Sequence, residues 1–170
     1  MKLSQQAAVT LTELLIVLVI ICATAMLAPS FIEFASKARV RHYEQQLFLL
    51  VQQARIHAAT HRARVTVCPL DDNQMCHRNW NAQISAFEDP TGKRHLNHDD
   101  KLIATLPALP LIVVDWKGMG GNRAIHFNLH GHTAVTNGRF RLCRQGKVIR
   151  ELVLNRQGRL RRSVTEDSQC

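Results

Sequence analysis

Leu14 to Ala28 read LLIVLVIICATAMLA, fifteen consecutive residues without a charge, and this stretch decides how the N-terminal part of the chain folds. Glu13 is the only charged residue in positions 3–32. A helix over residues 9–32, rising about 1.5 Å per residue, would cover a hydrocarbon core of roughly 30 Å. The sequence therefore predicts an apolar helix over 9–32 that can span a membrane.

Two ordinary explanations of this apolar stretch fit it poorly. A cleaved secretory signal has a basic start, a short apolar run and a small-residue cleavage site after that run. Here an acid precedes the run, and helix-forming sequence follows it. A plain single-span anchor has no use for a carboxylate at its edge, because a charge in lipid is costly unless it is paired. We therefore expect the carboxylate of Glu13 to be paired with a positively charged group.

The residues around Glu13 resemble the type IV prepilin signature, in which a short leader is cut before a segment like F-T-L-I-E-L. They read Ala8-Val-Thr-Leu-Thr-Glu13-Leu. The resemblance implies a leader over residues 1–8, cut by a prepilin peptidase between Ala8 and Val9, and N-methylation of Val9. It also implies that Glu13 pairs with the terminal amine of a neighbouring subunit during assembly. Ala8 and Val9 replace the usual Gly and the usual Phe or Met.

Residues 33–60 continue the helical pattern but become one-sided. Apolar residues spaced 4, 3, 4 and 4 apart form one stripe: Tyr43, Leu47, Leu50, Ala54 and Ala58. The opposite face is expected to carry the polar residues Arg39, Glu44, Gln45, Gln52 and Arg55. We expect this amphipathic half to pack on a globular head.

Residues 61–170 read as short strands separated by turns. The apolar or alternating runs are Val65–Val67, Trp80–Ala86, Leu111–Val114, Ala124–Leu129, Arg139–Cys143 and Val148–Leu154. Turn pairs such as Asn137-Gly138 and Gln157-Gly158 separate them. Short strands after one long helix predict the α+β class, with the helix packed on an antiparallel β-sheet head.

Several landmarks of this head resemble the GspH/FimT group of minor pilins and pseudopilins. They are Trp80…Phe87-Glu-Asp89, Ile125-His-Phe127…Gly131, and Phe140-Arg-Leu-Cys143 followed by Gly158-Arg-Leu-Arg161. The resemblance implies a type IV pilin fold, with residues 9–32 in the inner membrane or, after assembly, in the fibre core. It implies a Gram-negative, single-pass protein with its head in the periplasm, which joins other pilin subunits in a surface pilus.

The cysteines predict disulfide bonds in the head. One of the five, Cys22, lies inside the apolar run, and a head outside the cytoplasm leaves the other four in an oxidising compartment. Four cysteines allow three pairings. We favour Cys68–Cys76, which closes an Asp/Asn-rich loop, and Cys143–Cys170, which fixes the last residue to a strand. A metal site is the alternative, but C-x-x-C spacing is lacking.

The histidines do not form a recognisable catalytic or metal site. His57 and His61 are four residues apart on the helix, and His126, His130 and His132 lie around a turn. A solvated face is the simpler interpretation of both groups. The sequence offers no nucleophile–base pair and no phosphate-cradling glycine loop. We expect no cofactor, no metal and no enzymatic activity.

The charge is unevenly distributed along the chain. Lys and Arg number 22 against 13 Asp and Glu, which gives a net charge of +9 and a pI near 10.0. Nine of those cations, against the single acid Glu151, lie in residues 139–162. Such a cluster favours a polyanionic partner, either nucleic acid or an anionic membrane surface.

Gly158-Arg159-Leu160-Arg161 resembles the G-R-x-R motif that minor pilins of natural transformation, the FimT branch, carry in association with DNA binding. Two strand residues span roughly 6.8 Å, close to the roughly 7 Å between phosphates along one strand. The segment has no aromatic side chain for base stacking, so backbone binding of double-stranded DNA is expected. The predicted contacts are Arg156, Arg159, Arg161, Arg162, Arg150 and Lys147.

Other interpretations of this segment remain open. Related secretion pseudopilins often end in a Gly-Arg strand, so Gly158 can be a structural residue. The segment can be a solvated basic hairpin, or one that faces anionic lipid. The alternative function is a structural or assembly-initiating minor pilin, or a type II secretion pseudopilin, whose head contacts only proteins.

Overall fold

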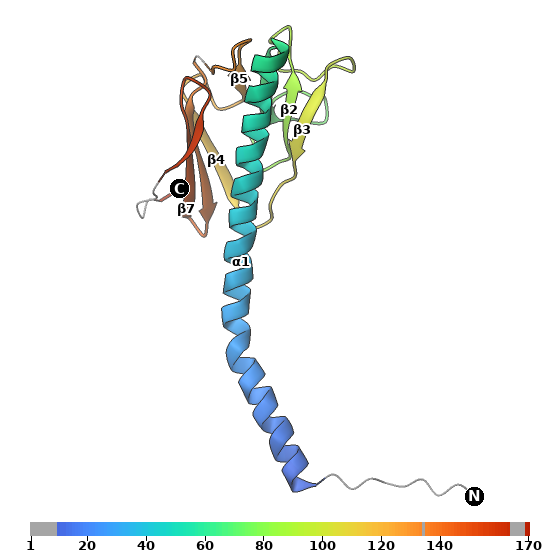
Figure 1. Cartoon of the computed structure of the whole chain (residues 1–170), viewed down its shortest axis with the longest axis vertical. Helices are drawn as coiled ribbons and strands as arrows, with labels where there is room; N and C mark the ends of the chain where they lie inside the picture. Colours follow the sequence, from blue (N-terminus) through green and yellow to red (C-terminus); the bar gives the residue numbers. More distant parts are fainter. Residues whose placement is uncertain (1–9, 134, 164–168) are drawn as a thin grey trace, which may run out of the picture. The chain divides into compact units, whose positions relative to one another are not determined.

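The computed structural model describes residues 10–133, 135–163 and 169–170, with the backbone alone for residues 25–33. One helix, α1 (Leu11–His61), precedes all the strands (Figure 1). The chain divides into two units, Met1–Arg41 and His42–Cys170, and each is described by itself.

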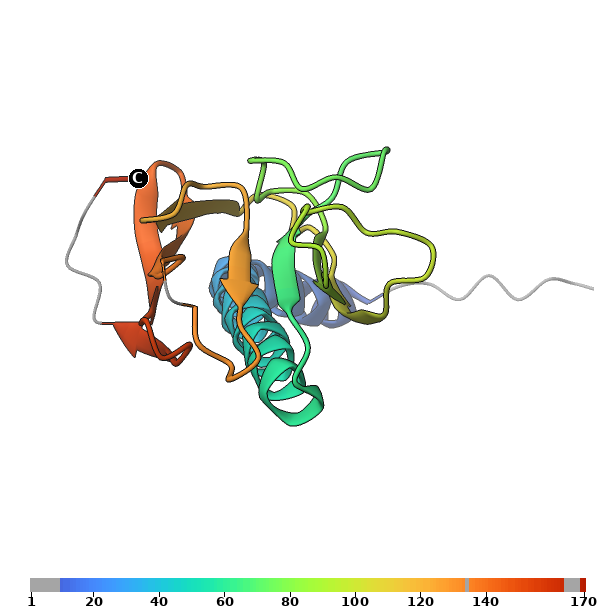
Figure 2. The same cartoon turned by 90° about the horizontal axis from the view of Figure 1, so that it is seen from above.

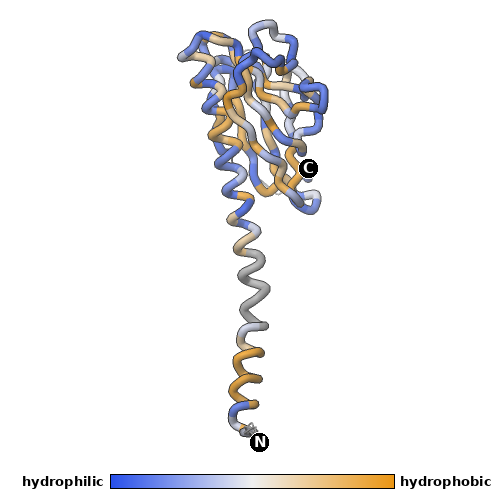
Figure 3. The backbone as a smooth tube through the Cα atoms, turned by 90° about the vertical axis from the view of Figure 1, so that its right-hand side faces the viewer, coloured by the Kyte–Doolittle hydropathy of each residue, from blue (hydrophilic) through white to orange (hydrophobic). Residues whose placement is uncertain are grey.

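The first unit contains the start of α1. The hydroxyl of Thr10 accepts a 3.4 Å hydrogen bond from the backbone N–H of Glu13, which caps the first turn. Large apolar side chains from Leu14 to Ile21 are exposed, and this part of the chain is orange in Figure 3. Among the described residues, no helical stretch is both long and apolar enough to cross a membrane. The cleavage and methylation sites predicted at Ala8 and Val9 lie outside the described residues.

The second unit buries one face of α1. The stripe expected from the sequence is buried throughout, with exposed fractions of 0–3%: Tyr43, Leu47, Leu50, Ala54 and Ala58. Burial of an apolar helical face is the main source of helix stability in a protein. Glu44, expected on the polar face, is instead only 4% exposed, because two arginines from the strands reach its carboxylate.

The strands form two antiparallel sheets, where the sequence predicted one. The first has the order β3-β2-β1-β5. Its strands are β1 (Val65–Pro69), β2 (Ile84–Glu88), β3 (Leu102–Leu106) and β5 (Ile125–Phe127). β3 was not expected from the sequence, and the predicted strand at Trp80–Ala82 is a turn that precedes β2.

The second sheet carries the basic C-terminal segment and has the order β4-β6-β7-β8. Its strands are β4 (Val113–Gly118), β6 (Gly138–Arg144), β7 (Lys147–Leu154) and β8 (Leu160–Ser163). Both sheets lie on the same side of the helical turns of this unit (Figure 2). The α+β class with antiparallel pairing is therefore confirmed.

Aromatic side chains join the second sheet to the loop before β2. The ring of Phe140 lies 4.4 Å from that of Trp116 and 5.3 Å from that of Trp80, measured between centroids. All three residues are at most 2% exposed. Burial of aromatic rings at these separations contributes strongly to a small core, so this cluster joins the loop before β2 to strands β4 and β6.

Two disulfides are present, in the pairing favoured from the sequence. Cys68 on β1 is joined to Cys76, with 5.5 Å between their Cα atoms. Cys143 on β6 is joined to Cys170, with 6.3 Å between their Cα atoms. The second bond fixes the last residue of the chain to the sheet that contains the basic segment.

We predict that the Cys143→Ala/Cys170→Ala variant loses about 3–4 kcal/mol of unfolding free energy, because the disulfide that it lacks restricts a long loop of the unfolded chain. The sequence separation is 27 for this pair but 8 for Cys68–Cys76. The Cys68→Ala/Cys76→Ala control closes a shorter loop, for which the same relation gives about 2.5 kcal/mol. Urea denaturation without reductant measures both. A loss below 1 kcal/mol for the first variant would contradict the prediction.

Candidate nucleic-acid interface

The turn between β7 and β8 is held closed by one residue, Asn155. Its carbonyl oxygen accepts a hydrogen bond from the N–H of Gly158 at 3.0 Å, and its side-chain Oδ1 accepts one from the N–H of Arg159 at 2.9 Å. Its own N–H donates to the carbonyl of Arg159 at 3.1 Å. Asn side chains favour this local pattern, and its three hydrogen bonds close the turn.

Gly158 lets this turn dock against the rest of the head. Its φ is +74°, and a Cβ atom there would lie 2.2 Å from the carbonyl oxygen of Gly131 and 3.2 Å from Cδ of Arg55. Only glycine fits so close an approach at a positive φ. Thr133 completes the contact, since its N–H donates to the carbonyl of Arg156 at 3.0 Å. The turn therefore rests on α1 and on the turn after β5.

Four of the predicted arginines are exposed around this turn, and one of them, Arg162, is ion-paired to Glu44. Arg156, Arg159 and Arg161 are solvent-exposed, while Leu160 between the last two is only 5% exposed. This is the alternation of an extended strand with one side on the core. Residues 152–163 contain no acidic residue, so nothing within this stretch offsets the three charges.

Arg162 and Arg150 occupy the opposite, helix-facing side of the sheet. The Nε of Arg162 donates to Oε1 of Glu44 at 2.5 Å, and the Nε of Arg150 lies 3.3 Å from Oε2 of the same carboxylate. The guanidinium of Arg162 also lies 5.5 Å from the ring centroid of Phe48. These two arginines are therefore ion-paired to a buried carboxylate, although their side chains remain 59% and 42% exposed.

Lys147 lies far from the turn. It begins β7, and Leu154 ends it, so the two are separated by seven residue steps of strand. At about 3.3 Å per residue this is roughly 23 Å. Lys147 is paired in register with Arg144 at the β6–β7 turn, at the other end of the sheet. The structure does not bring Lys147 together with the arginines of the β7–β8 turn.

The strand register adds two cations that the sequence analysis did not select as contacts. Lys117 on β4 pairs with Arg139 on β6, Arg139 with Val153 on β7, and Val153 with Arg161 on β8. Lys117 and Arg139 are both exposed, and Arg139 lies 3.6 Å from Glu151. Because paired residues lie on the same face of a sheet, the three cations form one row across it. Only the register could reveal this row.

Arg55 is a further cation beneath the turn. Its side-chain carbons contact the sites of Gly131 and Gly158, and its Nε is buried without a hydrogen-bond partner. The sequence placed Arg55 on the polar side of α1 and gave no sign that the turn containing Gly158, which is 103 positions further along the chain (158 − 55), would cover it. An arginine at this position adds positive charge under the exposed three.

The paired histidines of α1 have a structural role. His57 Nε2 lies 2.5 Å from Oε1 of Glu88 on β2, and its ring stacks on that of His61 with 4.0 Å between centroids. In the described part of the chain, no group of three or more His, Cys, Asp or Glu residues could hold a metal ion.

The fold defines the class of protein to which the chain belongs. A long N-terminal helix packed on antiparallel sheets, with the C-terminal residues fixed to a sheet by a disulfide, is the type IV pilin fold. Two crystal structures of the type IV minor pilin FimU from Pseudomonas aeruginosa (strain PAO1) are similar. One has a TM-score of 0.61 at 17% identity, over 77% of this chain and 92% of that chain. The other has a TM-score of 0.57 at 17% identity, over 73% and 92%.

The family follows from the sequence of the head. Residues 45–158 match the family model described as Type II transport protein GspH. The chain therefore belongs to the GspH family. Among curated proteins, none matches the sequence.

We predict that Gly158→Ala destabilises the protein much more than Gly146→Ala. Both glycines have positive φ values, +74° and +76°, but a Cβ at position 146 would meet nothing within 4 Å. Gly146→Ala should therefore lose only about 1 kcal/mol of unfolding free energy, because alanine adopts a positive φ less readily than glycine. Gly158→Ala should lose at least about 2 kcal/mol more, because its Cβ also clashes with the backbone. Urea denaturation of the two variants measures the difference. Equal losses would mean that the turn does not dock as described.

Proposed function

We propose that this minor pilin binds extracellular double-stranded DNA for uptake in natural transformation, as the FimT branch of the family does. The binding site is the arginine turn, defined here as Arg156, Arg159 and Arg161. Lys117, on the same face of the sheet, adds a further cation, whereas Arg139 is left out because it is ion-paired to Glu151. The site contacts phosphates and reads no base sequence.

The observation that carries this proposal is the fixed, uncompensated exposure of the arginine turn. Its backbone is held by Asn155 and docked through Gly158, so little backbone conformational entropy is lost when DNA binds. Arg159 and Arg161 share one face of an extended segment, at a spacing of roughly 6.8 Å that matches successive phosphates. Guanidinium groups can donate two hydrogen bonds to one phosphate.

The proposed contact set is smaller than the set expected from the sequence. Arg150 and Arg162 are omitted because Glu44 engages both, and Lys147 because it lies at the far end of β7. A cation that is already paired to a carboxylate releases little additional counterion when DNA approaches.

The assembly steps belong to the same proposal. A prepilin peptidase cuts between Ala8 and Val9, Val9 is methylated, and the helix sits in the inner membrane before other pilin subunits recruit it. Glu13 then pairs with the terminal amine of a neighbour. The pilus presents the head at the cell surface, where retraction brings bound DNA inward.

We predict that Arg159→Gln/Arg161→Gln weakens binding of unrelated duplexes by on the order of tenfold or more at low salt, because two phosphate contacts are lost. The slope of log K against log salt should become flatter by about 1.8. The measurement is a salt series of fluorescence-anisotropy titrations on the full chain in a non-ionic detergent.

The matched control removes two exposed cations elsewhere, Lys101→Gln/Arg123→Gln. This variant has the same net charge as the first and should keep nearly all of the affinity. If both variants lose affinity equally, the effect comes from net charge and the site assignment is wrong. Unchanged binding by the Arg159/Arg161 variant would reject it as well.

A second prediction concerns Glu44. Glu44→Gln removes the carboxylate that engages Arg150 and Arg162, so these cations gain freedom to approach DNA. We expect tighter binding and a salt slope steeper by up to about 1.8, with a lower unfolding free energy because the pairs are broken. Gln45→Glu, which places an acid at the exposed neighbouring position, is the control and should not strengthen binding. A slope unchanged by Glu44→Gln would show that the two arginines play no part.

The rival function is an assembly subunit or secretion pseudopilin, which the description of the matching family model favours. Such a protein shows no salt-sensitive DNA binding, and deletion of its gene impairs pilus assembly or secretion before DNA uptake. A membrane-surface role predicts comparable affinity for anionic lipid vesicles, so the anisotropy series includes competing vesicles.

A further inference from the structure

A cavity of about 270 Å³ lies between the start of β1, the loop after β2 and the turn after β5. Two arginines, two histidines and one carboxylate contribute to its lining: Arg64, Arg94, His126, His132 and Asp89. Thr133 also lines it and hydrogen-bonds the carbonyl of Arg156 at 3.0 Å, so the cavity adjoins the arginine turn.

The carboxylate of Asp89 is already satisfied by the protein. Asp89 is 1% exposed. Its Oδ1 accepts a hydrogen bond from the N–H of Lys93 at 3.1 Å, and its Oδ2 accepts from the N–H of Arg94 at 3.0 Å and from the hydroxyl of Thr66 at 2.8 Å. Three donors stabilise the charge of this carboxylate. The charges of Arg64 and Arg94 can therefore bind a further anion in the cavity.

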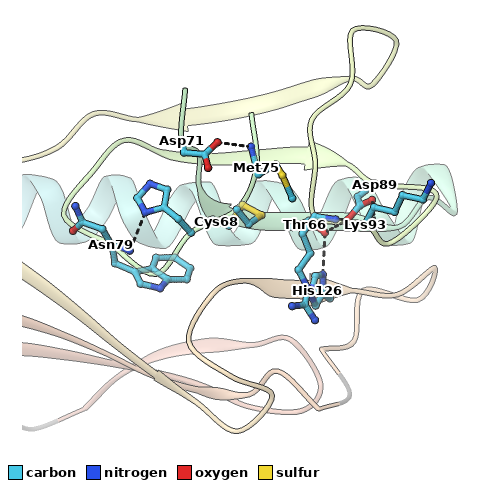
Figure 4. Close-up of a disulfide and its surroundings, with 12 residues drawn as sticks. Thr66, Cys68, Asp71, Met75, Asn79, Asp89, Lys93 and His126 are labelled. Carbon is cyan, nitrogen blue, oxygen red and sulfur yellow. Dashed lines mark hydrogen bonds between the residues drawn. A yellow bond between two sulfur atoms is a disulfide. The ribbon is translucent and has the colours of Figure 1, made fainter. Parts of the chain in front are cut away.

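The hydrogen-bond directions fix the tautomer of His126. The Nε–H of Arg94 donates to His126 Nε2 at 3.2 Å, so Nε2 is the unprotonated nitrogen and Nδ1 carries the ring hydrogen. Nδ1 donates to the hydroxyl of Thr66 at 2.9 Å, and that hydroxyl donates to Asp89 (Figure 4). A second proton on His126 must therefore bind Nε2, which breaks the contact with Arg94.

The electrostatic field at His126 is positive on balance. The pKa of His126 is lowered from its ordinary value of 6.5 by burial first and then by Arg94, with Arg64 acting in the same direction. Asp89 opposes them without reversing the shift. An anion in the cavity would offset both arginines, and protonation of His126 would then become less costly.

From this geometry, we propose that the cavity is a binding site for a phosphate group, held by Arg64 and Arg94 and closed on one side by His126. Planar guanidinium groups match the oxygens of a tetrahedral oxyanion. When the anion enters, Arg94 turns from His126 Nε2 to the ligand, and Nε2 takes up a proton and donates to the same ligand. This site adjoins the arginine turn but is built from other residues, so it does not depend on DNA binding there.

The test is calorimetric titration of the full chain, in non-ionic detergent, with inorganic phosphate and with sulfate. Saturable binding of both anions is expected, weakened about tenfold or more by Arg94→Gln, as for the loss of a charge-assisted hydrogen bond. Lys93→Gln is the matched control, since it removes the adjacent exposed cation from the same loop while its backbone contact to Asp89 stays. Thermal unfolding of each variant confirms that it is folded, and Arg64→Gln supplies a second variant.

The pH dependence of sulfate binding reports the protonation of His126, because sulfate itself stays a dianion throughout the range from pH 8 to pH 5.5. Bound sulfate raises the pKa of His126 above its lowered value in the free protein, so sulfate affinity should rise as the pH falls from 8 to 5.5, and His126→Gln should remove the rise. The remaining charged or titratable groups around the ring, Arg64, Arg94, Asp89 and His132, are unchanged in that variant. Absence of saturable binding to either anion, or equal binding by Arg94→Gln and Lys93→Gln, would overturn the proposal.

A second experiment distinguishes two possible sources of the phosphate group, the end of a DNA strand and a free anion. Hairpin duplexes with and without a 5′-terminal phosphate compete against sulfate in the same titration. Stronger competition by the phosphorylated duplex identifies a DNA end as the ligand, and equal competition identifies a free anion; either outcome supports the site. The Arg159→Gln/Arg161→Gln variant should still bind sulfate, so failure of the proposed DNA-binding turn and failure of this cavity are distinguishable.

Discussion

A single buried carboxylate determines which arginines of the head are available to a partner. Glu44 is 4% exposed and receives Arg162 from β8 and Arg150 from β7. A carboxylate cannot be left unpaired in such a place, because its desolvation would be too costly. These contacts fasten β8, the last strand in the order of its sheet, to the helix. Two cations of the C-terminal cluster are thus ion-paired within the fold, although their side chains stay partly exposed, and their neighbours Arg159 and Arg161 face solvent on the other side of the strand.

The sequence predicted those parts of this arrangement that depend on the spacing of apolar residues within one helix or one strand. The stripe from Tyr43 to Ala58 is buried as its helical spacing predicts, and Leu160 is buried between exposed arginines as strand alternation predicts. Glu44 was misplaced because the sequence around it shows only a polar residue at the margin of the stripe. Its partner Arg162 is 118 residues away, and pairing over such a distance leaves no local signal.

The strands missed or misplaced have similarly physical explanations. β3 is an edge strand with both faces partly exposed, so its sequence LIATL lacks the alternation of a half-buried strand. Trp80 and Ala82 alternate with polar residues, yet Asn79 folds this segment into a turn by accepting the N–H of Ala82 at 3.1 Å. The indole N–H of Trp80 is then satisfied by the carbonyl of Asn122 at 2.6 Å. Local turn chemistry here outweighs the strand period.

The Gly-Arg-Leu-Arg segment contains residues needed for folding and residues available for binding, and the motif alone does not tell them apart. Gly158 is needed because the turn touches Gly131 and Arg55, and Leu160 because it closes the core. Both requirements hold whether or not the protein binds DNA, so the same hairpin can persist in relatives that bind only other proteins. Arg159 and Arg161, by contrast, project outward from a stretch without acids. Fixed and uncompensated charge of this kind raises the potential outside the turn at no benefit to folding. The outward arginines, and not the glycine, are therefore the part of the motif that points to a polyanion.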